Sequence, residues 1–361
     1  MIRRTLLHVY PSFEVGGSQR RFVRIANHFG GDYRHLIVAL DGHTAAASLL
    51  SSDLDASLLP LAPAPPGLAG RLRLYRDLLR HWRPDLLVTA NWGSIEWAMA
   101  NLACAVPHLH LEDGFGPDEA DGQLSRRVWA RRLLLRRSRV VLPSRTLWRL
   151  AHDCWRLPER CLHYVPNGID LARFAGARGR GQGGPGGPVP VIGTVAALRP
   201  EKNLARLLDA FALVRQSCLV RLVIAGDGPL RGALEARAEA LGIAPDVEFL
   251  GHCARPEEVL SGLDVFVLSS DTEQMPLSLL EAMALGCAVV ATDVGDVRAM
   301  LPAEQQDFVV PRSAEDLAAA MSGLLNDGGL RDRLGRANEE AVRRDSDEHE
   351  MFTAYRRLYD A

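Results

Sequence analysis

Short apolar runs and longer amphipathic segments alternate along the first half of the chain. The apolar runs predict buried strands at residues 6–9, 36–40, 86–89, 106–111 and 140–142. Segments with apolar residues three and four positions apart predict helices at residues 19–29, 72–82 and 146–155. Strands that alternate with helices in this way are typical of a parallel sheet covered by helices on both faces.

The same alternation restarts after residue 190. The predicted strands and helices occupy residues 191–195, 205–214, 219–225, 230–241, 247–250, 265–268 and 288–292. The stretch at 175–190 is dominated by glycine, arginine, glutamine and proline, so it can bury little apolar surface and predicts a flexible linker. We therefore predict an α/β protein with one domain at residues 1–174 and another at 191–340. Apolar residues at helical spacing predict a C-terminal helix within 341–361, which could cross back to the first domain.

The loop after the apolar run at 265–268 carries the most informative polar residues. Pro276 suits the first position of a helix and Gly286 the position just past its end. Glu273 then lies at the carboxyl end of the strand, and Glu281 lies about a turn and a half into the helix. In an open α/β sheet, ligands bind at that end, where the start of the helix offers unpaired N–H groups to an anion. Two carboxylates beside an anion site suit a nucleotide sugar.

Several motifs together resemble the family-4 retaining glycosyltransferases of the GT-B fold, which are group 1 glycosyltransferases of the bacterial polysaccharide type. They are Gly16-Gly17-Ser18-Gln19, Val165-Pro166-Asn167-Gly168-Ile169-Asp170, Leu198-Arg199-Pro200-Glu201-Lys202-Asn203, Ala225-Gly226-Asp227-Gly228-Pro229-Leu230, Phe249-Leu250-Gly251, and Glu273 with Glu281 eight positions later. The resemblance covers nearly the whole chain and is strongest at residues 165–297. It implies two Rossmann-like domains facing each other across a cleft, with the acceptor bound by the first and the nucleotide sugar by the second.

The resemblance also implies roles for single residues. Glu281 would bind the ribose hydroxyls, because a carboxylate can accept two hydrogen bonds from a vicinal diol, and Glu273 would face the donor sugar. Further donor-binding candidates in the second domain are Gly226, Gly228, Gly251, Met275, Pro276 and Leu277. In the first domain, Gly16 and Gly17 open a helix and could bring backbone N–H groups to a phosphate. A tight turn without a ligand is the alternative for these two glycines.

Arg199 and Lys202 are the candidates for holding the diphosphate, because positioned cations stabilise the negative charge of the leaving group. The arginine usual in the family two positions earlier is Ala197 here. Arg199 either reaches the same phosphates from its shifted position or points to solvent.

In the resembling family, a histidine or aspartate in a loop of the first domain contacts the donor sugar. Alignment of the usual His-Asp pair places Glu112 at the histidine position and Asp113 at the aspartate position. We take Asp113 as the catalytic candidate, with Glu112 and His110 as alternatives. The segment Asn91-Trp92-Gly93 would line the acceptor side, or else Trp92 is a buried core residue.

Residues 126–139 contain seven arginines among apolar residues. Helical spacing predicts an arginine-rich face and an apolar face bearing Trp129 and Leu133. Such a helix could contact an anionic membrane surface peripherally. An amphipathic helix that packs its apolar face into the core explains the pattern equally well.

Composition narrows the possibilities further. The chain has 361 residues, 47% hydrophobic and 24% charged, with a net charge of −2, which fits two soluble domains and gives no support to nucleic-acid binding. Six isolated cysteines predict reduced thiols, and no apolar run approaches the ~20 residues of a membrane span. The apolar N-terminal run predicts a strand, not a signal peptide. We expect a cytoplasmic protein that could contact the inner membrane face.

No metal or bound cofactor is expected. Asp53-Leu54-Asp55 spells a metal motif of another glycosyltransferase fold but lies away from the predicted nucleotide loops. The acidic loop at 113–121 lacks the spacing of a calcium-binding hand.

The resemblance thus predicts a metal-independent, retaining hexosyltransferase. Its donor would be a nucleoside-diphosphate sugar and its acceptor a hydroxyl of a glycan or lipid-linked precursor. A nucleotide-sugar epimerase or hydrolase of the same fold and a non-catalytic nucleotide-sugar-binding protein remain as alternatives. A dinucleotide-dependent oxidoreductase is disfavoured, because neither half has Gly-x-Gly-x-x-Gly after its first strand.

Overall fold

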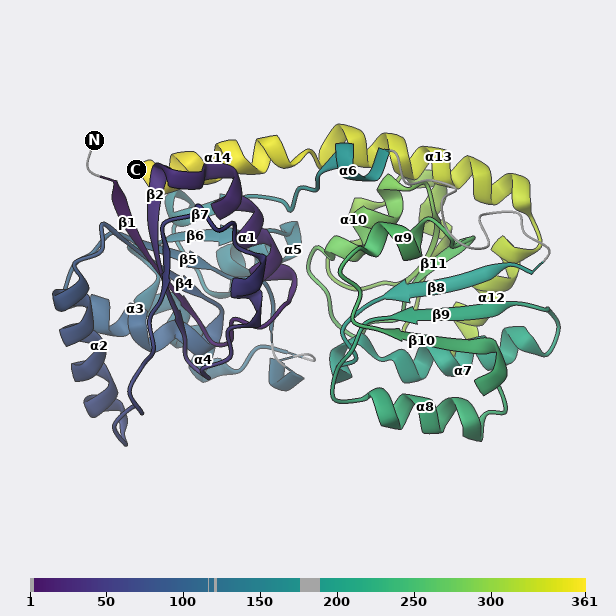
Figure 1. Cartoon of the computed structure of the whole chain (residues 1–361), viewed down its shortest axis with the longest axis horizontal. Coiled ribbons are helices and arrows are strands. Elements are labelled where there is room, and N and C mark those ends of the chain that lie inside the picture. The colour runs from purple at the N-terminus through teal and green to yellow at the C-terminus, as the bar shows by residue number, and fades with distance from the viewer. Residues whose placement is uncertain (1–2, 116, 120–121, 176–188) are drawn as a thin grey trace. The chain divides into compact units, whose positions relative to one another are not determined.

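The computed structural model describes residues 3–115, 117–119, 122–175 and 189–361, which form two α/β units (Figure 1). The first unit comprises Met1–Pro166 together with His349–Ala361, and the second comprises Asn167–Glu348. Each unit has its own parallel sheet and its own apolar core. The α/β fold class predicted from the alternation of strands and helices is therefore confirmed.

The chain passes between the units at Pro166–Asn167, whereas the sequence placed the change of domain at the 175–190 linker. Most of that linker, 176–188, lies outside the described residues. The reason for the earlier boundary is packing: the side-chain amide of Asn167 donates to the carbonyl of Met275 at 2.7 Å. Phe174 is buried in the second unit's core.

The first unit contains a sheet of seven parallel strands in the order β3-β2-β1-β4-β5-β6-β7. The strands are β1 (Arg4–Tyr10), β2 (Tyr33–Ala39), β3 (Ala56–Leu58), β4 (Leu86–Ala90), β5 (His108–Leu111), β6 (Arg139–Leu142) and β7 (Leu162–Tyr164). The helices are α1 (Gly17–Phe29), α2 (Leu68–Trp82), α3 (Ile95–Asn101), α4 (Ser125–Leu134), α5 (Arg145–Arg149) and, from its second residue, α14 (Glu348–Asp360). In the register, Leu7 of β1 pairs with Leu36 of β2 and Leu87 of β4.

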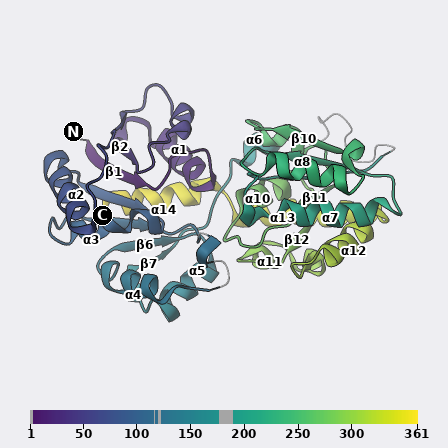
Figure 2. The same ribbon diagram turned by 90° about the horizontal axis from the view of Figure 1, so that it is seen from below.

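Helix α14 lies beside α1 in the first unit (Figures 1 and 2). Its buried side chains join the same apolar core as the first two strands, and they are Met351, Phe352, Tyr355, Leu358 and Tyr359. The Phe352 ring stacks on His28 of α1 with ring centres 3.9 Å apart. The segment predicted as one helix is divided, because α13 ends at Asp345 and α14 begins at Glu348.

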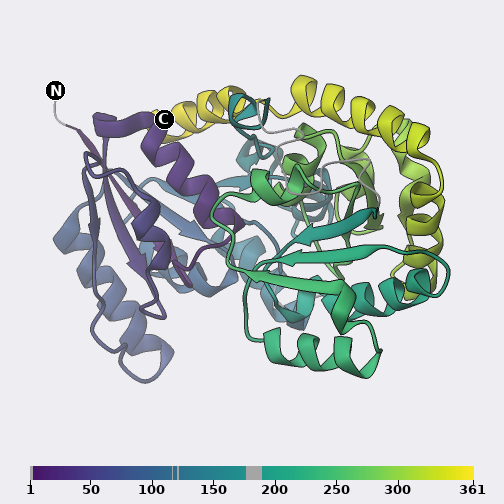
Figure 3. The ribbon, with the colours of Figure 1, turned by 45° about the vertical axis from the view of Figure 1, so that its right-hand side comes forward.

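The second unit contains six parallel strands in the order β10-β9-β8-β11-β12-β13. They are β8 (Val191–Val195), β9 (Arg221–Ala225), β10 (Val247–Gly251), β11 (Val265–Leu268), β12 (Ala288–Thr292) and β13 (Val309–Val310). The helices are α6 (Leu171–Ala175), α7 (Leu204–Arg215), α8 (Arg231–Ala240), α9 (Pro256–Leu260), α10 (Leu277–Ala284), α11 (Val297–Met300), α12 (Ala314–Leu325) and α13 (Gly328–Asp345). Figure 3 shows β8, β9 and β10 side by side and pointing the same way.

Each sheet has one point where the strand order reverses. In the first unit the chain starts at β1, adds β2 on one side and β4 on the other. In the second unit β8 is flanked by β9 and β11 in the same way. Loops that leave neighbouring strands in opposite directions open a crevice at their carboxyl ends, where ligands of α/β proteins bind. The loops after β1, β4, β8 and β11 are therefore the places to look for function.

Candidate active site

The loops after β8 and β11 meet at the point where the second unit's strand order reverses. The Lys202 ammonium donates to Oε1 of Glu273 at 2.5 Å, and the Ser270 hydroxyl donates to the same oxygen at 2.7 Å. The Lys202 side chain is 24% exposed and that of Glu273 is 8% exposed. A cation and a carboxylate that the sequence assigned to the diphosphate and the sugar are thus bound to each other.

Contacts around Asp271 fasten these two loops together. Its carboxylate accepts from Asn203 at 2.9 Å and from the Arg206 guanidinium at 2.6 Å. Arg206 also donates to the carbonyl of Ser269 at 2.9 Å, and the Asp271 amide donates to the carbonyl of Glu201 at 2.9 Å. Preorganised loops hold Lys202 and Glu273 in place, as catalysis by positioned charges requires.

Sequence analysis missed Arg206 and Asp271. Both act through a contact between segments 65 positions apart, which only the fold brings together. One weak signal existed, since Arg206 is the third residue of α7 and lies three positions after Asn203 of the motif.

Asn203 connects the loop after β8 to α7. Its backbone has φ 41°, in the left-handed region that asparagine tolerates better than most residues. Its side-chain oxygen accepts from the Arg206 amide at 3.2 Å and so caps the helix. Arg199, at the start of the turn Pro200–Lys202, is exposed, and no ion pair of its side chain is present within the described residues. The structure brings Lys202 to Glu273 and leaves Arg199 at the surface.

Two glycines allow the loops after β8 and β9 to pack closely. A Cβ on Gly226, where φ is +143°, would lie 1.9 Å from the carbonyl oxygen of Ala196. A Cβ on Gly228 would lie 2.6 Å from the carbonyl oxygen of Leu198. The Gly226 amide donates to the carbonyl of Gly251 at 2.8 Å. The three glycines assigned to donor binding thus bring the loops after β8, β9 and β10 together, with backbone facing backbone.

Helix α10 carries the second glutamate of the motif. It begins at Leu277, so Pro276 is the residue before the helix and not its first residue. Glu281 is half-buried and lies near Arg173 of α6, which binds Glu257 through two bonds of 3.0 and 2.6 Å. Burial lowers the pKa of Arg173, but the bond to Glu257 and the charge of Glu281 outweigh it and raise the pKa above its usual value.

In the first unit, Asp113 lies in the loop after β5 and contacts the elements that follow β1 and β4 at the reversal point. Its carboxylate pairs with the buried Arg21 of α1 at 2.6 Å. Its amide donates to the side-chain oxygen of Asn91, after β4, at 2.8 Å. Gly17 begins α1, so the glycine-rich turn and Asp113 are linked through this helix. Burial alone lowers the pKa of Arg21, but Asp113 and two neighbouring tyrosines raise it above its usual value.

Glu112 and His110, the alternatives to Asp113, are fully buried. Glu112 accepts from the Arg131 guanidinium at 3.1 Å, and Arg131 also donates to Glu119 at 3.2 Å. Trp92, Phe115 and Trp155 surround that guanidinium, with ring centres 4.7–5.3 Å away. We call Glu112, Arg131 and Glu119 the Arg131 cluster. Of the three loop candidates, the structure leaves only Asp113 partly exposed.

Helix α4 differs from its predicted arrangement. Trp129 and Leu133, expected on a face apart from the arginines, are 57% and 63% exposed. The Arg132 guanidinium lies 4.6 Å from the Trp129 ring centre, while Arg131 is buried. Packing Trp129 and Leu133 into the core is therefore excluded. The cause is the Arg131 cluster, which turns one arginine inward and the apolar pair outward.

The described residues contain no group of three histidine, cysteine or acidic side chains arranged to hold a metal ion. Asp55 of the Asp-x-Asp motif instead lies 3.6 Å from Arg3 and 3.9 Å from Arg34. None of the six cysteines forms a disulfide within the part of the chain that the structure describes. None of the helices in the described ranges is long and apolar enough to cross a membrane.

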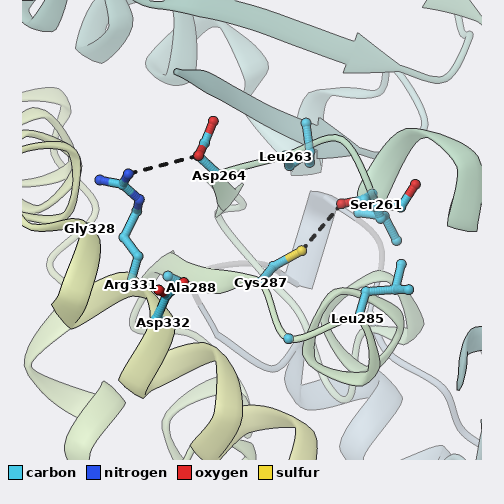
Figure 4. Close-up of a pocket in the computed structure, with 11 residues that line it drawn as sticks. Ser261, Leu263, Asp264, Leu285, Cys287, Ala288, Gly328, Arg331 and Asp332 are labelled. Atoms are coloured by element: carbon cyan, nitrogen blue, oxygen red, sulfur yellow. Dashed lines mark hydrogen bonds and ion pairs between the residues drawn. The ribbon is translucent and has the colours of Figure 1, made fainter. Parts of the chain in front are cut away.

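A cavity of about 180 Å³ lies at the amino ends of strands β11 and β12 in the second sheet (Figure 4). It is lined by the start of β12, by Asp264 just before β11, and by Arg331 of α13. The Asp264 carboxylate accepts from the amide of Val191, the first residue of β8, at 2.8 Å. Because it is at the amino ends of the strands, this cavity is separate from the Lys202–Glu273 site.

Comparison with known proteins gives matches in both halves of the chain. The family model described as Glycosyltransferase Family 4 matches residues 15–173, and the one described as Glycosyl transferases group 1 matches residues 180–341. The phosphatidyl-myo-inositol mannosyltransferase of Mycobacterium tuberculosis is 34% identical over 189 residues, 50% of this chain and 49% of that protein. The 2-deoxystreptamine N-acetyl-D-glucosaminyltransferase of Streptomyces fradiae is 30% identical over 280 residues, 70% of this chain and 64% of that protein. The matched stretch thus spans less than two thirds of either relative.

Solved structures agree in fold. Anabaena HepE in complex with UDP and glucose has a TM-score of 0.80 at 20% identity, and the match covers 99% of each chain. At this identity the likeness concerns the fold alone. Two parallel Rossmann-like sheets, the two family models and this structural match together show that the chain belongs to the group 1 glycosyltransferases and has the GT-B fold.

Proposed function

We propose that the protein transfers a sugar from a nucleoside-diphosphate sugar to a hydroxyl of a glycan or lipid-linked acceptor, with retention of the anomeric configuration. The observation that carries the proposal is the meeting of Lys202 and Glu273 at the reversal point of the second sheet. UDP is the first nucleotide to test, because the HepE structure, of the same fold, holds UDP.

In this proposal, Lys202 stabilises the charge that develops on the departing diphosphate, with Arg199 as a second cation. The unpaired N–H groups at the start of α10 add to the same effect. Glu273 accepts hydrogen bonds from sugar hydroxyls, and Glu281 accepts them from the ribose. Fixed cations at this point do the work that a divalent ion does elsewhere, so we propose that transfer needs no added metal.

Retention requires either a covalent intermediate or attack from the face that the leaving group departs. Glu273 is the carboxylate nearest to Lys202, and it accepts from both Lys202 and Ser270. A carboxylate bound in this way is a weak nucleophile. We therefore propose front-face attack, in which the leaving phosphate takes the proton of the acceptor and the enzyme contributes position and charge.

A lipid-linked acceptor would explain the exposed face of α4. Trp129 and Leu133 project to solvent beside Arg126 and Arg136, which are also exposed. Apolar side chains among arginines suit the surface of an anionic membrane, to which each basic residue contributes about 1 kcal/mol. The Mycobacterium tuberculosis relative carries the name of a lipid, phosphatidyl-myo-inositol, in its own name. We propose a cytoplasmic protein that contacts the inner membrane face through α4.

The donor is tested by thermal unfolding with UDP, GDP, ADP and TDP, each with and without magnesium. A ligand at 100 times its dissociation constant adds about 2.7 kcal/mol to stability, which raises the melting temperature measurably. Glu281→Ala should abolish the shift, whereas Glu304→Ala, an exposed carboxylate in the same unit, should keep it. No shift with any nucleotide would refute the donor proposal. Release of the nucleotide from its sugar without any acceptor would instead favour the hydrolase.

The membrane contact is tested by co-sedimentation with vesicles of anionic phospholipid at low salt. Trp129→Ser with Leu133→Ser should release the protein into the supernatant. Leu102→Ser is the matched control, because Leu102 is also 62% exposed in the same unit but lies at the end of α3 and not on α4. Equal sedimentation of all three proteins would remove α4 from the proposal.

A further inference from the structure

We infer that Glu273 competes with the nucleoside diphosphate for Lys202. Only a donor that still carries its sugar can give Glu273 a new hydrogen bond in place of the one that it loses. The inference rests on the proposed function, because it assumes that the diphosphate binds at Lys202. It adds a consequence that the proposed function does not contain: the site would bind the complete donor in preference to the spent nucleotide, and would so favour release of the product.

The cation that binds Glu273 is a lysine and not an arginine. Lys202 is the single lysine of the chain, although lysine and arginine together number 42. An arginine guanidinium binds a carboxylate through a rigid two-pronged contact, as Arg173 binds Glu257. A lysine ammonium is a compact charge on a flexible stem and holds its partner through single bonds. The one pair that must separate in each reaction cycle is the pair that uses lysine.

Glu273 cannot follow the Lys202 ammonium when a ligand draws that side chain away. Ser270 donates to its carboxylate, and the Ser270 carbonyl accepts from Thr292 at 2.7 Å. The backbone is also confined, because a Cβ on Gly295 would lie 2.0 Å from the carbonyl oxygen of Glu273. When a phosphate draws Lys202 away, Glu273 stays behind and loses a charged hydrogen bond at an 8% exposed position. Such a loss is unfavourable unless another donor replaces the ammonium.

The complete donor and the free nucleoside diphosphate differ in the hydrogen-bond donors that they bring to Glu273. A complete donor brings sugar hydroxyls, which can donate to Glu273 while the diphosphate takes Lys202. The free nucleoside diphosphate brings no hydroxyl to that position, so its binding leaves Glu273 with Ser270 but without a replacement for the ammonium. After transfer, the pair of Lys202 and Glu273 therefore re-forms at the expense of the bound product.

The test is a double-mutant cycle on UDP affinity, measured by calorimetry with the full chain. Glu273→Gln keeps the shape and can still accept from Ser270, but it removes the competing charge. We expect UDP to bind about 10-fold more tightly to this variant, since a hydrogen bond to a charged group contributes roughly 1.5–3 kcal/mol. In the Lys202→Met background, the same substitution should change UDP affinity less than about twofold, because the partner is gone.

Controls separate this competition from a general change of charge. Glu201→Gln removes a half-buried carboxylate from the same loop as Lys202 and should leave UDP affinity within about twofold. With UDP-glucose as the probe of the complete donor, Glu273→Gln should not tighten binding. Unfolding curves of each variant verify that it is folded.

Two outcomes would overturn the inference while the wild type still binds UDP. One is an unchanged or weaker UDP affinity of Glu273→Gln, and the other is an equal gain for UDP and UDP-glucose. Failure of the wild type to bind any of the four nucleoside diphosphates would be a different result. It would refute the proposed donor and the inference together.

Discussion

Both sheets present charged residues near the point where their strand order reverses, but they hold those charges in different ways. In the first unit, Asp113 and Glu112 are each bound by a buried arginine, Arg21 and Arg131. In the second unit, Glu273 is bound by a lysine that is a quarter exposed. Buried arginine pairs of this kind cannot separate without leaving an unpaired charge inside the protein.

This difference suggests different roles for the pairs in the two units. The arginine pairs of the first unit hold the acidic residues of the loop after β5, so we expect these pairs to support the fold. The lysine pair of the second unit is partly exposed, and in our proposal Lys202 exchanges Glu273 for a ligand. Breaking a pair in the first unit should therefore affect folding, and breaking the pair in the second should affect activity.

The largest effect is expected from Arg131→Met. It leaves the buried Glu112 without its arginine and Glu119 with Arg127 alone, and removal of one partner of a buried pair costs about 3–5 kcal/mol of unfolding free energy. All six tryptophans lie in the first unit, so fluorescence during urea unfolding follows that unit alone. Arg136→Met, at an exposed position of the same segment, should change stability by about 0.5 kcal/mol or less. Similar losses for both variants would contradict a structural role of the Arg131 cluster.

Lys202→Met should lower the rate of the reaction strongly and the stability only slightly. Loss of a positioned charge that stabilises a leaving group typically lowers the rate 10²–10³-fold, or about 2.7–4 kcal/mol in the barrier. Because Lys202 is partly exposed, the unfolding free energy should fall by only about 1 kcal/mol. Release of UDP from the donor measures the first quantity, and far-ultraviolet circular dichroism in urea measures the second. A large loss of stability with little loss of rate would reverse the comparison.

Acid should lower the unfolding free energy of the first unit by a smaller amount than Arg131→Met does. Ten of the 11 histidines belong to it, and burial lowers the pKa of His35 to about 4, with Asp55 opposing the shift. The unfolded chain takes up the proton at about pH 6.5, so stability is fully present above that pH and is lost as the pH falls toward 4. Between pH 7.5 and 4.5, His35 should contribute a loss of about 2–3 kcal/mol.

Tryptophan-monitored unfolding at the two pH values measures this loss. His35 bonds His8 at 3.0 Å, so the control replaces both residues with leucine and leaves no buried nitrogen unpaired. The double variant should lose less stability in acid than the wild type. An identical pH dependence would show that other groups cause it.

The smallest effect is expected at Asn203, which joins the lysine loop to α7. Asn203→Ala removes the helix cap and the bond to Asp271 and places alanine at φ 41°, for a loss of about 1–2 kcal/mol. Asn203→Gly should cost less, because glycine adopts this backbone conformation freely. Urea unfolding followed by circular dichroism compares the two, and a greater loss for glycine would contradict the role of backbone strain.

The fold was predictable from sequence because its signal is local. Runs such as 6–9 and 265–268 are buried strands in the structure, and their alternation with helices sufficed to predict two parallel sheets. The short strands β3, β7 and β13 were missed, since two or three residues carry no periodic pattern. Composition indicated a boundary at 175–190, whereas contacts divide the units at Pro166–Asn167, because composition shows where a chain is flexible and packing decides to which unit a segment belongs.

The site was predictable where motifs carry it and not where contacts do. Lys202 and Glu273 were proposed from their motifs, and the structure places them together. Nothing in the sequence indicated that Arg206 and Asp271 join their loops, or that Arg131 would turn inward while Trp129 turns outward. These arrangements depend on partners far along the chain, which periodicity cannot identify. The catalytic role of Asp113 stays a prediction.

Helix α14 has a consequence for the order in which the protein is made. The first unit's core includes Met351, Phe352 and Tyr355, which the ribosome adds after the whole second unit. Domains usually fold as units while synthesis proceeds from the N-terminus. Here the sheet of the first unit, complete at Tyr164, must wait for a helix that begins at Glu348, while the second unit can complete its core in between. The nascent first unit is therefore the part that most needs chaperone protection, and the part that a late ribosome stall would harm most.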